Sequence, residues 1–170
     1  DKKGNIAWQS VGIAPIRNNF SGLVPVPGDG RYEWDGYLPI IQKPNMLNPP
    51  EGYFATANQN VTPASYEHWN AIGFSWSDPF RGDRVEEVLG AGKKLNMADM
   101  KALQVDYHSI LASVLVPLLL DLPLTGKSDE AQAKLRGWDF NLAPNSIEAA
   151  IYVAFENKMS TLASSRFIPV

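Results

Sequence analysis

The chain has 170 residues, which suits one domain or one part of a larger domain, and 45% of them are hydrophobic, enough for a sizeable core. Its 15 basic and 18 acidic residues give a net charge of −3 without any basic run, which argues against a nucleic-acid-binding protein. The absence of cysteine excludes disulfides, thiolate catalysis and cysteine-based metal sites.

The sequence predicts no segment that spans a membrane. The longest apolar run, residues 110–120, is too short for a bilayer and contains Pro117. The chain opens on the turn-like sequence Asp1-Lys2-Lys3-Gly4, so we expect the natural start of the protein to lie upstream.

The chain changes character near residue 83. Residues 1–82 hold most of the prolines and glycines and four of the five tryptophans, whereas residues 83–170 hold longer stretches with helical spacing. We therefore expect an α+β fold, in which a few antiparallel strands from the first part pack with helices from the second. The whole of 1–170 is interpreted as one piece of a larger protein.

The first part is predicted to hold two strands, at residues 5–12 and 52–58. In the second strand, Tyr53 and Ala57 share one face while Phe54 and Asn58 share the other. The segments 17–48 and 61–82 are too rich in proline, glycine and aromatic residues for long regular elements, so we expect ordered loops there.

The second part is predicted to hold five helices, most of them introduced by a polar capping residue. They are expected after Asp83 up to Gly90, from Asn96 or Asp99, at 110–122 with a kink or break at Pro117, at 129–137 after Ser128, and at 147–158 after Ser146.

The first candidate functional residue is Asn58, at the end of the predicted strand 52–58. A carboxamide offers two N–H donors without a charge, and a donor beside a reacting carbonyl can stabilise an oxyanion. The same run, Asn58-Gln59-Asn60, is also typical of a plain turn after a strand. Its local sequence leaves both interpretations open.

The second candidate is Arg84. We expect it in the first turn of a helix, where the helix dipole disfavours a cation and an anionic partner is needed. Asp83 can supply that partner locally; alternatively Arg84 is directed at the site that Asn58 lines.

The sequence offers no credible nucleophile. A Gly-x-Ser-x-Gly elbow, a phosphate loop and a dinucleotide fingerprint are all absent. His68 and His108 lie far apart in the chain without metal-ligand spacing, and His108 is expected near the end of a helix. Seven aromatic residues could line an apolar acyl pocket, although most of them are expected to anchor the core and loops: Trp8, Trp34, Tyr37, Trp69, Phe74, Trp76 and Phe80.

Taken in order, several short motifs resemble the penicillin amidase family of N-terminal-nucleophile acylases, which includes penicillin, cephalosporin and acyl-homoserine-lactone acylases. The resemblance covers nearly the whole chain. The motifs are Gly4-Asn5-Ile6-Ala7-Trp8, Pro15-Ile16-Arg17, Pro25-Val26-Pro27-Gly28, Trp34-Asp35-Gly36, Asn48-Pro49 with Gly52-Tyr53, Ala57-Asn58, Asp83-Arg84-Val85, and Leu135 with Trp138-Asp139.

The resemblance implies a slice of an αββα sandwich and specific roles for two residues. The family's oxyanion-hole asparagine matches Asn58, and its active-site arginine matches Arg84. Because the chain carries about two more residues before Pro63 than its relatives, Asn60 is the alternative match. The family hydrolyses amides of small acylated compounds, such as a β-lactam or an acyl-homoserine lactone, with an N-terminal serine whose own α-amino group is the base.

The chain departs from this pattern because it begins with Asp1. The resemblance implies that the nucleophile-bearing part of the β-subunit and the α-subunit are its partners, and that the isolated chain is inactive. It also implies a periplasmic or secreted parent. No metal or cofactor is expected within the chain, although the whole enzyme can hold a structural calcium. Apolar surface left uncovered predicts self-association.

Two other functions remain open from the sequence. One is a non-catalytic binding or structural module that keeps the acylase fold. The other is a free-standing hydrolase that uses His68 or His108.

Overall fold

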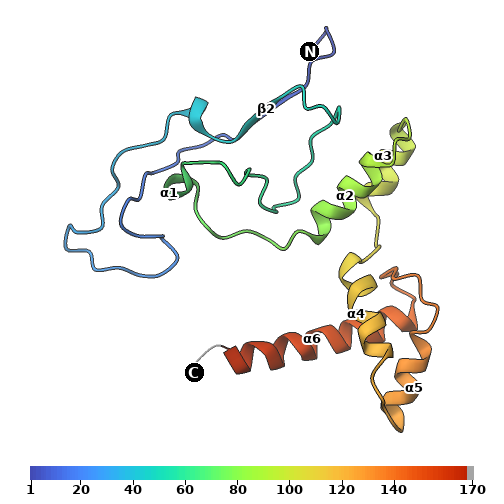
Figure 1. Cartoon of the computed structure of the whole chain (residues 1–170). Coiled ribbons are helices and arrows are strands. Elements are labelled where there is room, and N and C mark those ends of the chain that lie inside the picture. The colour runs from blue at the N-terminus through green and yellow to red at the C-terminus, as the bar shows by residue number, and fades with distance from the viewer. Residues whose placement is uncertain (168–170) are drawn as a thin grey trace. The chain divides into compact units, whose positions relative to one another are not determined.

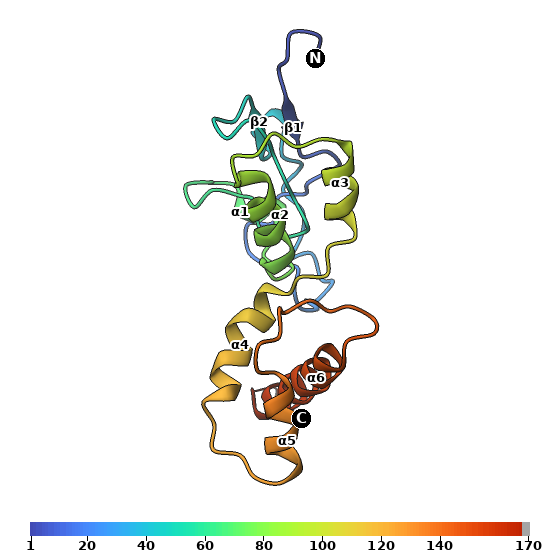
Figure 2. The same ribbon diagram turned by 90° about the vertical axis from the view of Figure 1, so that its right-hand side faces the viewer.

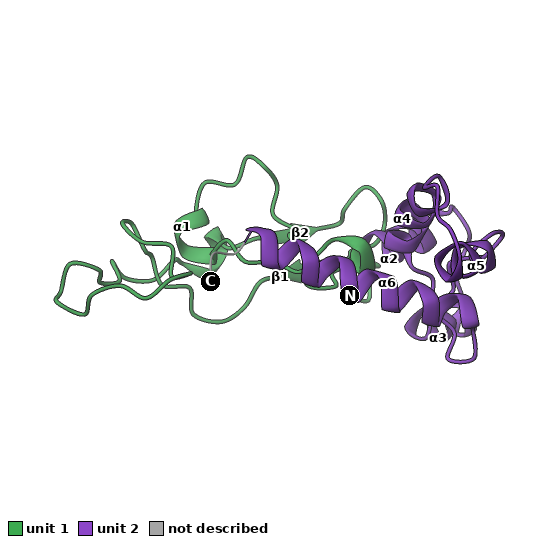
Figure 3. Cartoon of the chain, turned by 90° about the horizontal axis from the view of Figure 1, so that it is seen from below, with its two compact units in different colours: residues 1–82 green, residues 83–170 purple. Residues whose placement is uncertain are grey.

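The computed structural model describes residues 1–167, which form two compact units, Asp1–Gly82 and Asp83–Val170 (Figure 3). Within the described residues the chain holds a two-stranded antiparallel sheet, six α-helices and one short 3₁₀ helix. The predicted α+β class is therefore confirmed, with the strands in unit 1. No helix in this range is both long enough and apolar enough to cross a membrane.

The sheet of unit 1 joins β1 (Ala7–Gln9) to β2 (Asn45–Leu47), which lie side by side in Figure 2. Trp8 faces Met46 across the pair, and its ring stacks on Phe54 with centroids 4.7 Å apart. The strand predicted at 52–58 is wrong, since β2 is the partner of β1 and the segment 53–56 forms no ladder. An alternating pattern alone does not make a strand without a neighbour to pair with.

The motifs noted in the sequence meet in pairs within unit 1. Ile16 donates its N–H to the Gly36 carbonyl at 3.0 Å, and Asp35 donates to the Ile16 carbonyl at 2.9 Å. Ile6 donates its N–H to the side-chain oxygen of Asn48 at 2.9 Å. These hydrogen bonds tie the loops together over long sequence distances, so the loop-rich half is ordered although it has little regular structure (Figure 1).

Two short helices of unit 1 were not predicted. They are the 3₁₀ helix η1 (Ile40–Gln42) and α1 (Trp69–Ile72). The loop at Arg17 is fixed to α1, because the Arg17 backbone N–H donates to the Asn70 carbonyl at 3.0 Å.

The remaining helices lie at α2 (Phe80–Gly90), α3 (Met97–Gln104), α4 (Ile110–Leu120), α5 (Lys127–Lys134) and α6 (Ile147–Phe167). Asn96, one of the two starts that the sequence left open, caps α3 in a full capping box with Asp99. Ser146 accepts from the Ala149 N–H at 3.0 Å at the start of α6, as predicted.

Several predicted helix boundaries are wrong. Helix α2 begins at Phe80, so Asp83 lies in its first turn and does not cap it. Gly126 precedes α5, where Ser128 was expected. Helix α4 continues through Pro117 without a break, and α6 extends well past residue 158.

The core of unit 2 forms where α4, α5 and α6 gather (Figures 1 and 2). It is built around Tyr152 and Trp138, whose ring centroids lie 5.6 Å apart. Burial raises the pKa of the Tyr152 hydroxyl to about 12, and the nearby charge of Glu156 adds to the effect. The buried residues of this core are Ala112, Val116, Leu135, Trp138, Ala149 and Tyr152.

Candidate functional site

Asn58 occupies a tight turn in which its backbone is left-handed, with φ at 71°. Asparagine tolerates this conformation better than most residues that carry a Cβ, because its short amide can bond locally. Its carbonyl accepts from the Ser77 N–H at 3.1 Å. On either side, the Ala57 N–H donates to the side-chain oxygen of Gln59 at 2.6 Å. These hydrogen bonds therefore fix the backbone at Asn58.

The first turn of α2 fixes the direction of the Asn58 carboxamide. Arg81 Nη2 donates to Asn58 Oδ1 at 2.9 Å and to the Ala57 carbonyl at 2.8 Å. Asn58 Nδ2 has no acceptor among residues 1–167. The amide oxygen is thus engaged while both N–H groups are available to another molecule.

Gly82 allows α2 to approach the turn this closely. It is buried, and a Cβ added there would overlap the side-chain amide of Gln59. Glycine inside a helix costs about 1 kcal/mol relative to alanine, so a close approach explains its use at this position.

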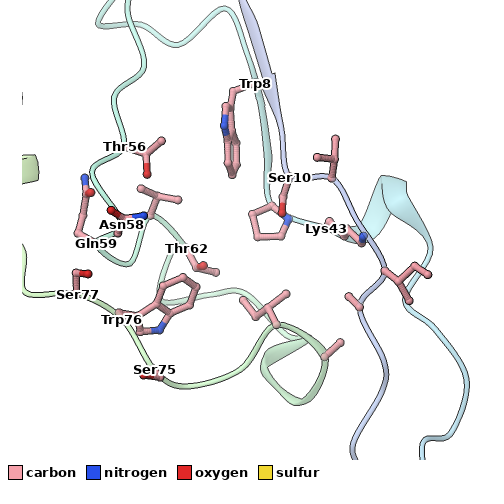
Figure 4. A pocket seen from close by; sticks show the side chains of 17 residues that line it. Trp8, Ser10, Lys43, Thr56, Asn58, Gln59, Thr62, Ser75, Trp76 and Ser77 are labelled. Atoms are coloured by element: carbon pink, nitrogen blue, oxygen red, sulfur yellow. The ribbon is translucent and has the colours of Figure 1, made fainter.

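Asn58 lines a pocket of about 660 Å³ that lies entirely within unit 1. Trp8 and Trp76 form apolar parts of its wall, and Thr56, Ser75 and Ser77 add hydroxyl groups. Figure 4 shows the Asn58 oxygen on the outer side and its nitrogen on the side toward the tryptophans. The pocket therefore combines apolar walls with hydroxyl groups and a neutral N–H donor, and Lys43 also lines it. Apolar walls with a few polar groups are typical of small-molecule sites.

Asn60 differs from Asn58 in its surroundings. Its side-chain oxygen accepts from the Thr62 N–H at 2.9 Å, which closes a local Asx turn. It lines a neighbouring hollow of about 470 Å³ beside Tyr66, which shares Trp8 and Lys43 with the pocket of Asn58. The geometry gives Asn60 a turn-forming role, while Asn58 lines the larger pocket.

Arg84 lies in unit 2, in the second turn of α2, so the first-turn position expected for it is wrong. Its guanidinium donates to Asp106 at 2.7 Å and to Glu87 at 2.8 Å, and Asp83 is not its partner. The hydrogen bond with Asp106 raises the pKa of Arg84.

Burial alone would raise the pKa of Asp106, but the hydrogen bonds from Arg84 and from the His108 N–H outweigh it and hold that pKa below its usual value. The pair is partly shielded, with 26% of the Arg84 side chain and 20% of the Asp106 side chain exposed. Arg84 also lines a hollow of about 400 Å³ within unit 2. The roles of Asn58 and Arg84 in a reaction stay predictions.

The rings of both histidines pack against aromatic side chains. His68 precedes α1, and its ring meets Tyr66 edge to face with centroids 5.6 Å apart. His108 lies in a β-bridge with Asn141 instead of on a helix, and its ring meets Phe140. In the part of the chain that the structure describes, neither ring hydrogen-bonds to a serine. Over the same range, no group of three acidic or histidine side chains is placed to hold a metal ion.

Sequence reasoning missed Arg81 and Ser77 as parts of this site, whereas Trp8 and Trp76 are two of the aromatic residues that it had considered for an acyl pocket. Arg81 stands three residues before Arg84, just ahead of the Asp83-Arg84-Val85 motif. That proximity was the one signal in the sequence that could have drawn attention to Arg81. The contact between Arg81 and Asn58 depends on the path of the chain from 59 to 80, which is irregular.

The family model of penicillin amidase matches residues 1–167. The chain belongs to the penicillin amidase family. The match covers the pocket of unit 1 together with the helices of unit 2.

The curated relatives include acylases that are named for two different substrates. The chain is 35% identical over 167 residues to acyl-homoserine lactone acylase QuiP of Pseudomonas fluorescens, a match that covers 89% of this chain and 20% of the relative. It is 29% identical over 169 residues to penicillin acylase 2 proenzyme of Pseudomonas sp. strain SE83, covering 98% of this chain and 22% of that protein. The chain therefore spans about a fifth of the length of the relatives it matches.

A solved structure shares the fold. The thermostable penicillin G acylase from Alcaligenes faecalis superposes with a TM-score of 0.64 at 24% identity, over 86% of this chain and 27% of that one. The predicted resemblance is thus confirmed at the level of family and fold.

Proposed function

We propose that this chain is part of an acylase that hydrolyses the amide bond of a small acylated compound, such as a β-lactam or an acyl-homoserine lactone. The observation that carries the proposal is the Asn58 carboxamide, which lines the pocket of unit 1 with its oxygen held by Arg81 and its N–H groups free of acceptors in the described residues. Membership of the penicillin amidase family supports the reaction class.

In the proposed reaction, Asn58 donates an N–H to the oxygen of the amide carbonyl as that oxygen gains negative charge. A donor placed in this way stabilises the tetrahedral intermediate more than the uncharged substrate, and its loss typically costs about 2.7–4 kcal/mol of activation free energy. The aromatic walls of the pocket would bury the apolar part of the substrate.

The attacking group would come from polypeptide outside this chain: a serine at the N-terminus of a β-subunit, whose own α-amino group takes the proton. Arg84 would orient the completed site. We propose the rest of that acylase as the partner of this chain and an αββα sandwich as the architecture they form together. We also propose a periplasmic or secreted location for that acylase.

Exposed apolar side chains in unit 1 support a partner that covers it. Among them, Val11 is 77% exposed and Ile13 and Ile41 are each 80% exposed. Burying these side chains against another part of the protein would remove apolar surface from water, which is favourable.

The experiment is turnover of a chromogenic acyl-anilide by the full-length protein that carries this chain. We expect Asn58→Ala to lower kcat on the order of 10²- to 10³-fold. Asn60→Ala is the matched control, because it removes an equivalent amide two residues away, and we expect it to change kcat by less than about tenfold. Equal losses in both variants, or an unchanged kcat in Asn58→Ala, would contradict the proposal.

The isolated 170-residue chain gives a second test. We expect no acyl-anilide turnover, since the nucleophile is supplied from elsewhere. Turnover that survives repurification would contradict this assignment. Loss of that turnover in His108→Ala but not in Asn58→Ala would favour a free-standing hydrolase.

A further inference from the structure

Arg81 sets the orientation of the Asn58 side chain. A single nitrogen, Nη2, joins the Asn58 carboxamide oxygen at 2.9 Å to the Ala57 carbonyl at 2.8 Å. The guanidinium thus bridges the side chain of Asn58 and the backbone of the residue before it. Both contacts lie within unit 1.

The chemistry of the guanidinium decides which way the amide faces. A carboxamide turned by half a rotation exchanges its oxygen for its NH₂ group. Arginine has N–H donors and no acceptor, so a turned Asn58 would leave its NH₂ group against Arg81 without a partner. It would also point an oxygen into the pocket, where it would repel a developing oxyanion. Arg81 therefore favours the orientation in which Asn58 is a donor to the pocket.

The positive charge of Arg81 has a second effect. Hydrogen bonds from an ionised donor are about twice as strong as neutral ones, and they polarise the group that accepts them. Drawing electron density toward the amide oxygen makes the N–H groups of Asn58 stronger donors. This effect increases as the substrate oxygen becomes negative.

We infer that Arg81 is a positioning residue for the proposed acylase reaction, which fixes and polarises the Asn58 carboxamide as an oxyanion donor. The inference rests on the proposed function of Asn58. Arg81 itself acts through that amide and needs no contact with the substrate, whereas Arg84 is engaged by Asp106 and Glu87 in unit 2.

The test is a double-mutant cycle in the full-length protein, with acyl-anilide turnover measured for Arg81→Ala, Asn58→Ala and the double variant. We expect Arg81→Ala to lower kcat about 10- to 100-fold while KM changes by less than about threefold. Because Arg81 acts through Asn58, the double variant should match Asn58→Ala within about twofold.

Three further variants separate orientation from folding. Arg81→Lys keeps a cation that can only donate, and should recover part of the lost kcat. Arg81→Gln offers an acceptor as well as donors, so it permits the turned amide and should recover little. Arg31→Ala is the matched control, since Arg31 is an exposed arginine of the same unit whose ion pair is with Asp29; it should leave kcat unchanged.

The outcomes distinguish the two proposals. The role of Arg81 is overturned if kcat is unchanged in Arg81→Ala, or if the loss of kcat in the double variant equals the product of the losses in the two single variants. Neither result contradicts the proposed role of Asn58. An unchanged kcat in Asn58→Ala overturns both. If Arg81→Ala lowers the melting temperature, the comparison of Arg81→Lys with Arg81→Gln decides, and equal activity in those two variants overturns the inference.

Discussion

Each of the two compact units is stabilised internally by a different kind of interaction. In unit 2, six buried side chains from α4, α6 and the segment 135–138 that follows α5 form one core. In unit 1, the apolar side chains buried to the same degree are Leu38 and Ala71, and the loops are joined mainly by hydrogen bonds between distant segments. The candidate pocket lies in the unit with the smaller core.

This difference separates the part of the chain that is stabilised by packing from the part that positions polar groups around the pocket. Helical packing stabilises unit 2. The positions of groups around Asn58 are instead set by turns, a left-handed backbone and the contact with Arg81. Loops fixed in this way can present polar groups to a ligand, a task for which a packed core is unsuited.

The largest effect on stability should come from opening the core of unit 2. Leu135 is 1% exposed, and Leu135→Ala should cost about 2–5 kcal/mol of unfolding free energy because it leaves a cavity. Urea unfolding followed by far-UV circular dichroism measures it. Leu162→Ala is the matched control on α6, since Leu162 is 51% exposed. Equal shifts in the two variants would contradict the assigned core.

A smaller effect is expected at the helix that supports the pocket. Gly82→Ala places a methyl group against the Gln59 amide, and the resulting overpacking should cost about 1–3 kcal/mol, more than alanine regains in helix propensity. In the full-length protein it should lower kcat by displacing the Asn58 turn. Gly28→Ala, where a Cβ meets nothing within 4 Å, is the control. A Gly82→Ala variant with unchanged kcat and melting temperature would show that the contact is not needed.

The ion pair of unit 2 predicts a pH dependence. Because the folded pKa of Asp106 is lowered, its stabilisation is present above its unfolded pKa of about 4 and is lost as the pH falls through the folded value. Asp106→Asn should therefore destabilise the chain at pH 7 by about 1 kcal/mol, and the difference from the unaltered chain should vanish in strong acid. Urea midpoints across this range measure it. A difference that grows as the pH falls would contradict the sign.

The smallest effect is expected at the ion pair of unit 1. Asp29 and Arg31 lie 2.7 Å apart but are 47% and 66% exposed, so solvent screens them. Asp29→Asn should leave the urea midpoint unchanged. A clear shift would mean that this loop is covered by another segment.

The sequence predicted unit 2 more successfully than unit 1, for a physical reason. Helix caps act over three or four residues, so local patterns alone sufficed to assign Ser146 and to narrow the start of α3 to Asn96 or Asp99. The proposed strand at 52–58 failed because pairing needs a neighbour, and β1 pairs with Asn45–Leu47. Local alternation carries no information about that choice.

The candidate site shows the same limit. The sequence put Asn58 at the end of a predicted strand and left open whether it forms a plain turn or a donor site, and the structure puts it in a turn on the wall of a pocket. Arg81 was not predicted, because its contact with Asn58 joins residues 23 positions apart through an irregular loop. The partners of Arg84 were missed for a similar reason, since Asp106 lies 22 positions away.

The most direct test of the account is the affinity of the full-length protein for an alkyl boronic acid, whose tetrahedral adduct with a serine carries the negative charge of the transition state. The account predicts that Asn58→Ala weakens this binding on the order of 10²-fold, while KM for the uncharged acyl-anilide changes by less than about threefold. Equal boronate affinity in the two proteins would contradict the claim that Asn58 donates to a developing oxyanion.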